Sequence, residues 1–296
     1  MTIFGALGPS GTFSEFALQF WFKRQGLAQG DNSPQYILKD SISAVFHSLH
    51  HGECSKILVP VENSINGKVE TTLDHLLSLN TNCIESEFTV PIQHALLGNP
   101  KLVLDEVKFV LSHYQALGQC HAFLSLHLPS AIQVATESSA SAASYLVSND
   151  SNGMSGVPNE ANIDNTVIIG RESLASLYGL KVIAQRVNDN PNNITRFWVI
   201  GDENKSISGN DKTSLVFTTP NSPGALHDIL GIFSKNNINL ISIASRPSKK
   251  KLGEYFFYVD LEGHQDNPVL QTALSFVKSK SEFYKLFGSF PMEVKR

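Results

Sequence analysis

The first 200 residues alternate between short apolar runs and helix-forming segments, and this alternation constrains the fold more than any other feature. Residues 3–7 form an apolar run, residues 16–23 suit a helix, and residues 36–38, 41–50 and 57–61 repeat the pattern. We therefore predict an α/β fold. In open α/β sheets ligands lie beyond the carboxyl ends of the strands, so the loops that follow the strands are the places to search for a site.

The same pattern starts again after a long extended stretch. Residues 83–97 alternate apolar and polar side chains with period two, which is long for one strand and suits a crossing between two subdomains. Apolar runs then return at 107–111, 131–135 and 167–169, and the first two lead into helices rich in small side chains. The polar, Gly/Ser/Asn-rich stretch 149–165 is expected to be an exposed loop without chemistry. Two α/β lobes follow from this repetition.

Length and composition bound the class of protein. The chain has 296 residues, more than one average domain, with 42% apolar residues, a net charge of −4 and a pI near 6.2. No basic field for nucleic acid is present, and no apolar run approaches the roughly 20 residues that span a bilayer. With no basic leader at the N-terminus, we expect a cytoplasmic protein without nucleic-acid or membrane partners.

Cysteine and histidine spacing gives no reason to expect a metal. Cys54, Cys83 and Cys120 are isolated and odd in number, so neither a disulfide framework nor a zinc site is predicted. A phosphate-binding loop is also missing, because residues 8–15 match neither common glycine-rich nucleotide motif. We expect no cofactor.

Residues 8–15 form a strand-to-helix turn that suits a small anion. Backbone N–H groups and hydroxyls would lie at a helix N-terminus, where the dipole favours a carboxylate. Capping of that helix by Ser10, Thr12 or Ser14 is an equally good interpretation. A second polar segment, residues 62–69, follows the run 57–61 and is either part of the same cleft or an ordinary turn and cap.

Residues 191–199 place a hydroxyl and a cation at a loop-to-strand junction. Asn192 and Asn193 are turn formers and residues 197–200 are an apolar run, so Thr195 and Arg196 lie where the strand begins. Groups at such junctions are positioned yet reachable, which suits catalysis, although a surface turn entering a strand would look the same.

A linker divides the chain near residue 205. Residues 202–211 are polar and contain glycine, and beyond them the expected order is β-α-β-β-α-β, with strands at 214–219, 240–245, 255–261 and 283–294 and helices at 224–234 and 269–277. This is the ferredoxin-like arrangement, with helices on one face of an antiparallel sheet. We predict domains at 1–202 and 212–296.

Taken together, these segments resemble prephenate dehydratase followed by an ACT regulatory domain. The resemblance rests on the number, order and spacing of several motifs, which are G-P-x-G-T-F-S-E (8–15), V-P-V-E-N-S-x-x-G-x-V (59–69), T-L-D-x-L (72–76), S-H-x-Q-A-L-x-Q-C (112–120), Y-G-L (178–180) and N-x-T-R-F (193–197). It implies a two-lobed catalytic domain, similar to type II periplasmic binding proteins, with the site between lobes. The implied reaction converts prephenate to phenylpyruvate, water and carbon dioxide in phenylalanine biosynthesis.

The resemblance also implies roles for individual residues. Thr195 would donate a proton or hydrogen bond to the departing hydroxyl, Arg196 would place or neutralise a carboxylate, and Phe197 would anchor the motif. Glu62 is the alternative proton source. The expected substrate-binding residues are Thr12, Phe13, Asn63, Ser64, Gly67, Ser112, Gln115 and Ser139.

For the ACT domain, the resemblance implies an L-phenylalanine site at a dimer interface. The residues expected there are Asn221, Pro223, Gly224, Ala225, Leu226, Ser245, Arg246 and Pro247. Ala244 stands where the family usually has glutamate, which leaves the strength of inhibition open, and an ACT domain that serves only dimerisation is the alternative. A homodimer or homotetramer is expected.

Two other functions are compatible with the sequence. Arogenate dehydratase performs the same elimination on the aminated substrate, and a non-catalytic sensor of small carboxylates would share the lobes. The sequence contains no recognisable chorismate mutase segment, so we expect that activity on a separate chain.

Overall fold

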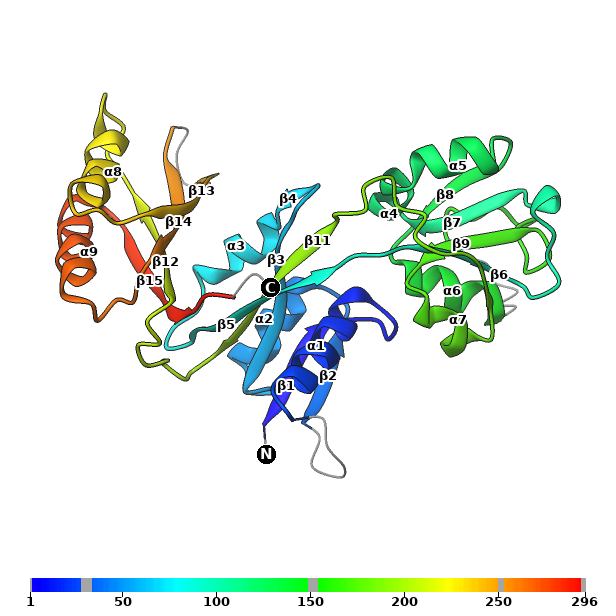
Figure 1. The fold of residues 1–296 in the computed structure, drawn as a ribbon, viewed down its shortest axis with the longest axis horizontal. Helices are drawn as coiled ribbons and strands as arrows, with labels where there is room; N and C mark the ends of the chain where they lie inside the picture. Colours follow the sequence, from blue (N-terminus) through cyan, green and yellow to red (C-terminus); the bar gives the residue numbers. More distant parts are fainter. Residues whose placement is uncertain (1, 28–33, 149–153, 250–252, 294–296) are drawn as a thin grey trace. The chain divides into compact units, whose positions relative to one another are not determined.

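The computed structural model describes residues 2–27, 34–148, 154–249 and 253–293, and their contacts group into two compact units (Figure 1). The first unit comprises Met1–Gly5, Ile42–Thr89 and Arg196–Arg296, and the second comprises Ala6–Ser41 and Val90–Thr195. Three of the four boundaries fall inside strands, so the chain passes between the units more than once.

The first unit contains a sheet whose strands are apolar on both faces. Its strands lie in the order β1-β3-β11-β5, with β4 beside β3. In β3, Ile57, Leu58, Val59 and Val61 are all fully buried, as expected for a strand covered on both sides. The elements of this part are β1 (Ile3–Leu7), α2 (Ile42–His50), β3 (Lys56–Asn63), β4 (Gly67–Lys68), α3 (Glu70–Leu76), β5 (Cys83–Pro91) and β11 (Ile194–Gly201).

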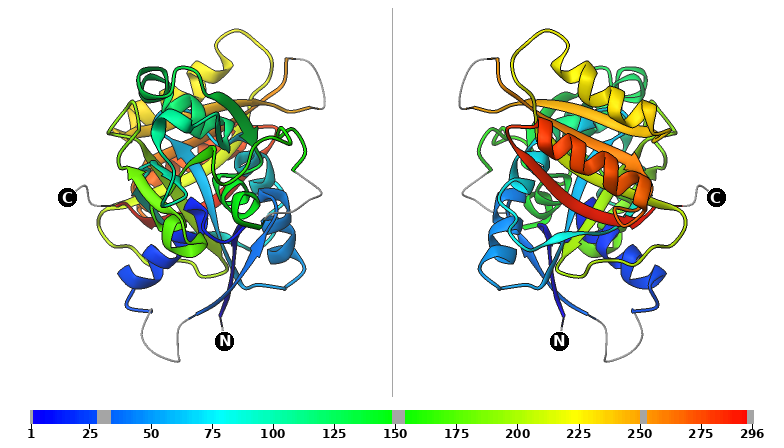
Figure 2. Two further views of the ribbon diagram at one scale, coloured as in Figure 1. Left: turned by 90° about the vertical axis from the view of Figure 1, so that its right-hand side faces the viewer. Right: turned by 90° about the vertical axis from the view of Figure 1, so that its left-hand side faces the viewer.

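The rest of the first unit is the predicted ferredoxin-like domain. Its sheet has the order β13-β14-β12-β15 with every neighbouring pair antiparallel, and both helices lie on one face (Figures 1 and 2). This confirms the β-α-β-β-α-β prediction. The elements are β12 (Asp211–Thr218), α8 (Ala225–Lys235), β13 (Leu240–Pro247), β14 (Tyr255–Glu262), α9 (Pro268–Lys280) and β15 (Tyr284–Pro291).

Strand alternation gives the two faces of this sheet different chemistry. Phe217 on β12 and Val259 on β14 pack against α8 and α9 in an apolar core. Lys212 and Asp260 lie on the same two strands at positions of the opposite parity, yet they are only 5% exposed. Because successive side chains of a strand point to opposite faces, the helix-free face carries buried charges.

The second unit is built around a mixed sheet covered on both faces. The strand order is β10-β6-β9-β7-β8. Strand β7 runs parallel to both β8 and β9, β6 runs antiparallel to β9, and β10 runs antiparallel to β6. One apolar cluster joins the sheet to α6 and α7, and another joins it to α4 and α5. The elements of the unit are α1 (Phe13–Arg24), β2 (Gln35–Lys39), β6 (Ala95–Gly98), η2 (Leu104–Glu106), β7 (Phe109–His113), α4 (Tyr114–Gln119), α5 (His121–His127), β8 (Ile132–Thr136), α6 (Ser139–Ser148), β9 (Thr166–Gly170), α7 (Ser173–Tyr178) and β10 (Lys181–Ala184). The predicted α/β class is confirmed.

Two predicted segments differ from the structure. The extended stretch 83–97 is two strands, since residues 92–94 leave the sheet and Ile92 N–H bonds instead to the Asn193 carbonyl at 2.8 Å. The helix expected from Ser112 onward is two helices that meet at Cys120. Within the predicted loop 149–165, residues 149–153 lie outside the described residues.

Three smaller findings bear on the predicted class of protein. Across the described ranges, no helix is both long and apolar enough to cross a membrane. Cys54, Cys83 and Cys120 are buried free thiols. In the same part of the chain, no three potential metal-binding side chains come together.

Candidate active site

The hairpin of β3 and β4 positions Glu62 in the first unit. The Asn63 side-chain oxygen accepts hydrogen bonds from the N–H groups of Ile65 and Asn66, each at 3.0 Å, which fixes the turn. Gly67 completes it with a φ of +77°, a backbone angle that disfavours other residues. Glu62 therefore lies opposite Lys68 across the hairpin. Ser64 lies in the same turn.

The side chains of Thr195, Arg196 and Phe197 on β11 point to two different faces of the sheet. Phe197 is 1% exposed and stacks on Phe88 at 5.9 Å. Arg196 instead lies over Trp198, with the guanidinium carbon 5.5 Å from the ring centroid. Strand alternation thus puts Thr195, itself buried, on the face of Phe197 and turns Arg196 to the other face.

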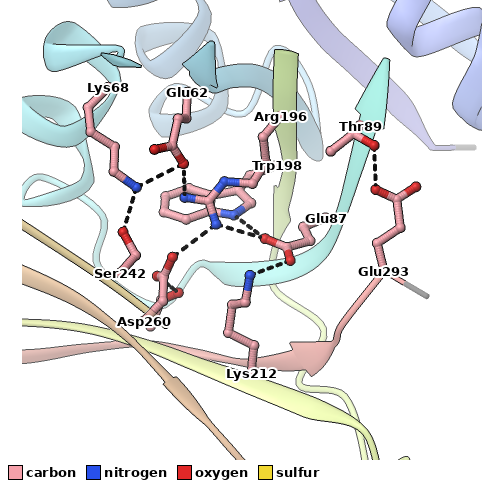
Figure 3. Close-up of polar contacts among 11 residues, drawn as sticks. Glu62, Lys68, Glu87, Thr89, Arg196, Trp198, Lys212, Ser242, Asp260 and Glu293 are labelled. Carbon is pink, nitrogen blue, oxygen red and sulfur yellow. Dashed lines mark hydrogen bonds and ion pairs between the residues drawn. The ribbon is translucent and has the colours of Figure 1, made fainter. Parts of the chain in front are cut away.

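Arg196 is surrounded by three carboxylates, as Figure 3 shows. Its Nη1 donates to Asp260 Oδ2 at 2.9 Å and to Glu87 Oε2 at 3.1 Å, and its Nη2 forms an ion pair with Glu62 Oε2 at 3.0 Å. Each carboxylate comes from a different strand, β14, β5 and β3 respectively. One guanidinium therefore connects the sheet that contains β3, β5 and β11 with the ferredoxin-like sheet.

Two lysines complete a cluster of alternating charge. Lys212 Nζ on β12 donates to Glu87 Oε1, and Lys68 Nζ donates to Glu62 Oε2 at 3.0 Å and to the Ser242 hydroxyl at 2.7 Å (Figure 3). Ser214 donates to the remaining oxygen of Asp260 at 2.6 Å. We call the six charged residues the Arg196 cluster, and they are Glu62, Lys68, Glu87, Arg196, Lys212 and Asp260.

The cluster keeps Asp260 ionised despite its burial. Burial alone would raise the pKa of Asp260, but the charges of Arg196 and Lys212 outweigh it, so the pKa lies below the ordinary value. For Arg196, burial works to lower the pKa, and Asp260 and Glu87 overcome that effect and raise it. The charged forms of Arg196 and Asp260 thus stabilise each other, and mutual pairing is the condition under which buried ions are tolerated.

In the second unit, the turn before α1 satisfies its own N–H groups. The Thr12 hydroxyl accepts from Glu15 N–H at 3.3 Å and donates to the Leu7 carbonyl at 3.0 Å. The Glu15 carboxylate accepts from Gly11 N–H at 2.6 Å and from the hydroxyls of Ser10 and Tyr36. Capping, one of the two interpretations of this turn, accounts for these contacts.

Two serines expected to bind substrate lie together in the second unit. The hydroxyls of Ser112, at the end of β7, and Ser139, at the start of α6, are 2.9 Å apart. Ser112 also donates to the Ile169 carbonyl, and it is fully buried. Gln115 lies nearby in sequence, in the first turn of α4, with its N–H bonded to His113 Nδ1.

A polar network that the sequence did not predict joins His94, Gln119 and Asn193 within the second unit. Gln119 Oε1 lies 3.0 Å from His94 Nε2 and accepts from Asn193 Nδ2 at 2.9 Å. The His94 ring stands edge-on to Phe13 at 5.3 Å, and burial lowers the pKa of His94. Asn193 is thereby fixed two residues before Thr195.

The ferredoxin-like domain contains a cavity of about 390 Å³, within the range of small-molecule sites. It lies where α8 begins, next to β14, and its lining includes Tyr255 and Phe257. Four residues of the predicted effector site line it, namely Asn221, Gly224, Ala225 and Leu226.

Residues 245–247 of the predicted effector site lie on β13, and Arg246 points away from the helices. Its guanidinium pairs with Glu70 at 2.5 Å and with Asp74 at 3.3 Å, both on α3. Pro223 precedes the cavity residue Gly224, while Ser245 and Pro247 are exposed. Ala244 shares its face with Arg246 and Ser242 by strand alternation.

Comparison with known proteins assigns the chain to a family. The sequence model described as prephenate dehydratase matches residues 4–205, and the model described as ACT domain matches residues 213–278. The chain belongs to the prephenate dehydratase family. The predicted family and its C-terminal ACT domain are confirmed.

Several relatives of the family resemble nearly the whole chain. A prephenate dehydratase of Methanocaldococcus jannaschii is 35% identical over 96% of both chains. A bifunctional chorismate mutase/prephenate dehydratase of Neisseria gonorrhoeae is 34% identical over 97% of this chain and 74% of the relative. The solved prephenate dehydratase of Arthrobacter aurescens in complex with L-Phe is 30% identical, covers 99% of this chain and 90% of its own, and has a TM-score of 0.83.

Within this prephenate dehydratase fold, the sequence prediction missed four of the six residues of the Arg196 cluster. Glu87, Lys212 and Asp260 were not singled out, and neither was Lys68, whose motif was quoted. A signal did exist. Glu87 and Asp260 each interrupt an apolar strand pattern, and a charge buried in a strand needs a partner of the opposite sign.

Proposed function

We propose that this chain catalyses the conversion of prephenate to phenylpyruvate, water and carbon dioxide, and that L-phenylalanine inhibits it through the ACT domain. The observation that carries this proposal is the match of the prephenate dehydratase model to residues 4–205. The catalytic motif, the substrate-binding residues and the effector cavity supply the chemistry.

Thr195 is proposed as the group that meets the departing hydroxyl. Loss of the ring carboxylate as carbon dioxide leaves an electron pair that completes the aromatic ring, while the C–O bond to the ring hydroxyl breaks and that oxygen leaves as water. A hydrogen bond or proton from Thr195 to that oxygen lowers the barrier. Aromatisation drives the reaction, which makes a weak acid sufficient.

Glu62 is the second candidate for the proton source. Its Oε2 forms ion pairs with both Lys68 and Arg196, at 3.0 Å each. Because these contacts already occupy that oxygen, we place Thr195 first. Thr12, Phe13, Asn63, Ser64, Gly67, Ser112, Gln115 and Ser139 are proposed to bind the substrate.

The effector site is proposed at the cavity beside α8. An amino acid needs an apolar wall for its side chain and polar groups for its two charged ends. Leu226 and Phe257 supply the first, and Asn221 and Ser222 the second. The relative solved with L-Phe supports phenylalanine as the ligand. A cytoplasmic homodimer or homotetramer, joined through the ACT domains, completes the proposal.

The test is a product assay with two substrates. Purified protein is incubated separately with prephenate and with arogenate, following phenylpyruvate and phenylalanine. Formation of phenylpyruvate from prephenate at the higher kcat/KM supports the proposal. Turnover of arogenate alone would assign the chain to arogenate dehydratase, the second candidate, and turnover of neither would exclude both dehydratases.

A further inference from the structure

The Arg196 cluster lies between a catalytic strand and a regulatory sheet. Arg196 and Glu62 belong to motifs of the prephenate dehydratase part, whereas Lys212 and Asp260 belong to the ACT sheet. All of its described contacts are within the first unit, and Asp260, Lys212 and Glu87 are at most 8% exposed. The cluster therefore connects the prephenate dehydratase part to the ACT sheet through buried ion pairs, and it is not a solvated surface patch.

The partners of Arg196 leave little of its charge for a substrate carboxylate. Two carboxylates accept from Nη1, and a third pairs with Nη2. Its side chain also points to the face of β11 opposite Thr195. These contacts suit a residue that holds the strand in place more than one that binds the reactant.

Strand β14 links the effector cavity to the cluster. Tyr255 and Phe257 line the cavity, and Asp260 follows three residues later, about 10 Å along the strand. Hydrogen bonds to β12 on one side and β13 on the other make β14 an inner strand of the sheet. One continuous, hydrogen-bonded strand thus runs from the cavity to Asp260.

We propose that Arg196 is a positioning residue and that Asp260 is the contact through which bound L-phenylalanine alters the rate of the reaction. Moving Asp260 would move the Arg196 guanidinium and, through one peptide unit, the Thr195 hydroxyl. A displacement of about 1 Å at a reacting group costs roughly 10²-fold in rate, so a small shift is enough. This inference rests on the proposed dehydratase activity and its inhibition by phenylalanine.

The first experiment compares inhibition in Asp260→Asn with that in the unmodified protein. The concentration of L-phenylalanine that halves activity should rise by about tenfold or more, within the usual 5- to 150-fold range of coupling between sites. Binding of L-phenylalanine, measured by equilibrium dialysis, should persist. Inhibition of the variant at the unchanged concentration would overturn the proposal.

Two further variants separate coupling from stability. Glu262→Gln makes the same carboxylate-to-amide change on β14 away from Arg196, and it should keep full inhibition. Asp260→Asn combined with Lys212→Met restores the charge balance of the cluster, which removes the cost of an unpaired buried cation. The double variant should still resist inhibition. A regain of inhibition there would mean that net charge, and not the Asp260 contact, transmits the signal.

The positioning role of Arg196 is tested by measuring kcat and KM separately. Arg196→Lys keeps the charge but loses the forked geometry, so kcat should fall while KM stays nearly constant. If KM rises with kcat unchanged, Arg196 binds the substrate and the positioning role is wrong.

Trp198 reports on the cluster independently of activity. Its Nε1 lies 3.4 Å from Glu87 Oε2, and Trp21→Phe leaves it as the single tryptophan of the chain. L-phenylalanine should change Trp198 fluorescence in that background, and Asp260→Asn should abolish the change. A protein that turns over prephenate but ignores phenylalanine would overturn the coupling alone. Inactivity toward prephenate would overturn the proposed function, and the fluorescence would still decide the coupling.

Discussion

Thr195 and Arg196 are adjacent in sequence but lie in different chemical surroundings. The pleat of β11 turns the hydroxyl and the guanidinium to opposite faces, and the buried Phe197 fixes the strand by stacking on Phe88. Such a strand can present a small, weakly acidic group to a reactant while a long cation on its other face holds the backbone. The order Thr-Arg-Phe therefore places the hydroxyl and the guanidinium on opposite faces, as the roles proposed for Thr195 and Arg196 require.

Replacing Thr195 tests the role proposed for its hydroxyl group. Thr195→Ala should lower kcat by roughly 10²-fold or more, the range that general acid catalysis contributes, because the departing oxygen loses its donor. Thr195→Ser keeps the hydroxyl and serves as the control, with most of the rate retained. Steady-state kinetics with prephenate and a thermal melt of each variant are the measurements. Near-normal turnover by a folded Thr195→Ala would move the proton source to Glu62.

Local sequence patterns correctly predicted the helices and strands whose formation depends on local sequence. The ACT order followed from alternation within single strands and the apolar stripe of α8, and its six elements are all present. The break at residues 92–94 was missed, since it depends on Asn188 and Asn193, about 100 residues away. The Arg196 cluster was missed for the same reason, because its carboxylates come from three strands that only the folded chain brings together.

Helix α3 is fastened to the ACT sheet at both ends. Arg246 pairs with Glu70, the first residue of α3, and with Asp74 in its second turn, and Lys285 Nζ on β15 donates to the carbonyls of Leu77 and Leu79 beyond its end. Unpaired carbonyls at a helix C-terminus carry partial negative charge, so a lysine there satisfies hydrogen bonds and the dipole together. Burial lowers the pKa of Lys285, and the two carbonyl oxygens replace part of the hydration that its ammonium group loses.

Removing that lysine should loosen the helix. Lys285→Met keeps the length of the side chain but leaves the carbonyls without a donor, and we expect a loss of about 2 kcal/mol in the free energy of unfolding, within the range for hydrogen bonds to charged groups. Urea unfolding measures it. Lys278→Met, an exposed change on α9, should have little effect and is the matched control. Equal stability of the two variants would contradict the anchoring role.

At the scale of the whole molecule, the ligand cavity of the ACT domain and its charged contacts to the other sheet lie in different places. The cavity lies at the start of α8, whereas Lys212 and Asp260 lie on the helix-free face and pair with Glu87 on β5 and Arg196 on β11. A ligand that binds only the folded ACT domain must stabilise it by mass action, whatever it does to catalysis. Ligand binding and rate control can therefore be measured separately on the same protein.

L-Phenylalanine should stabilise the folded protein by an amount set by its concentration. At 100 times its dissociation constant, the gain in unfolding free energy is about 2.7 kcal/mol, seen as a higher Tm. Ala225→Phe, which puts a ring into the cavity, should abolish the shift, and each variant is compared with itself so that its own stability cancels. Ser234→Phe places the same ring on the exposed side of α8 and should leave the shift intact. A shift that survives in Ala225→Phe would locate the phenylalanine site elsewhere and remove β14 as the route from effector to Arg196.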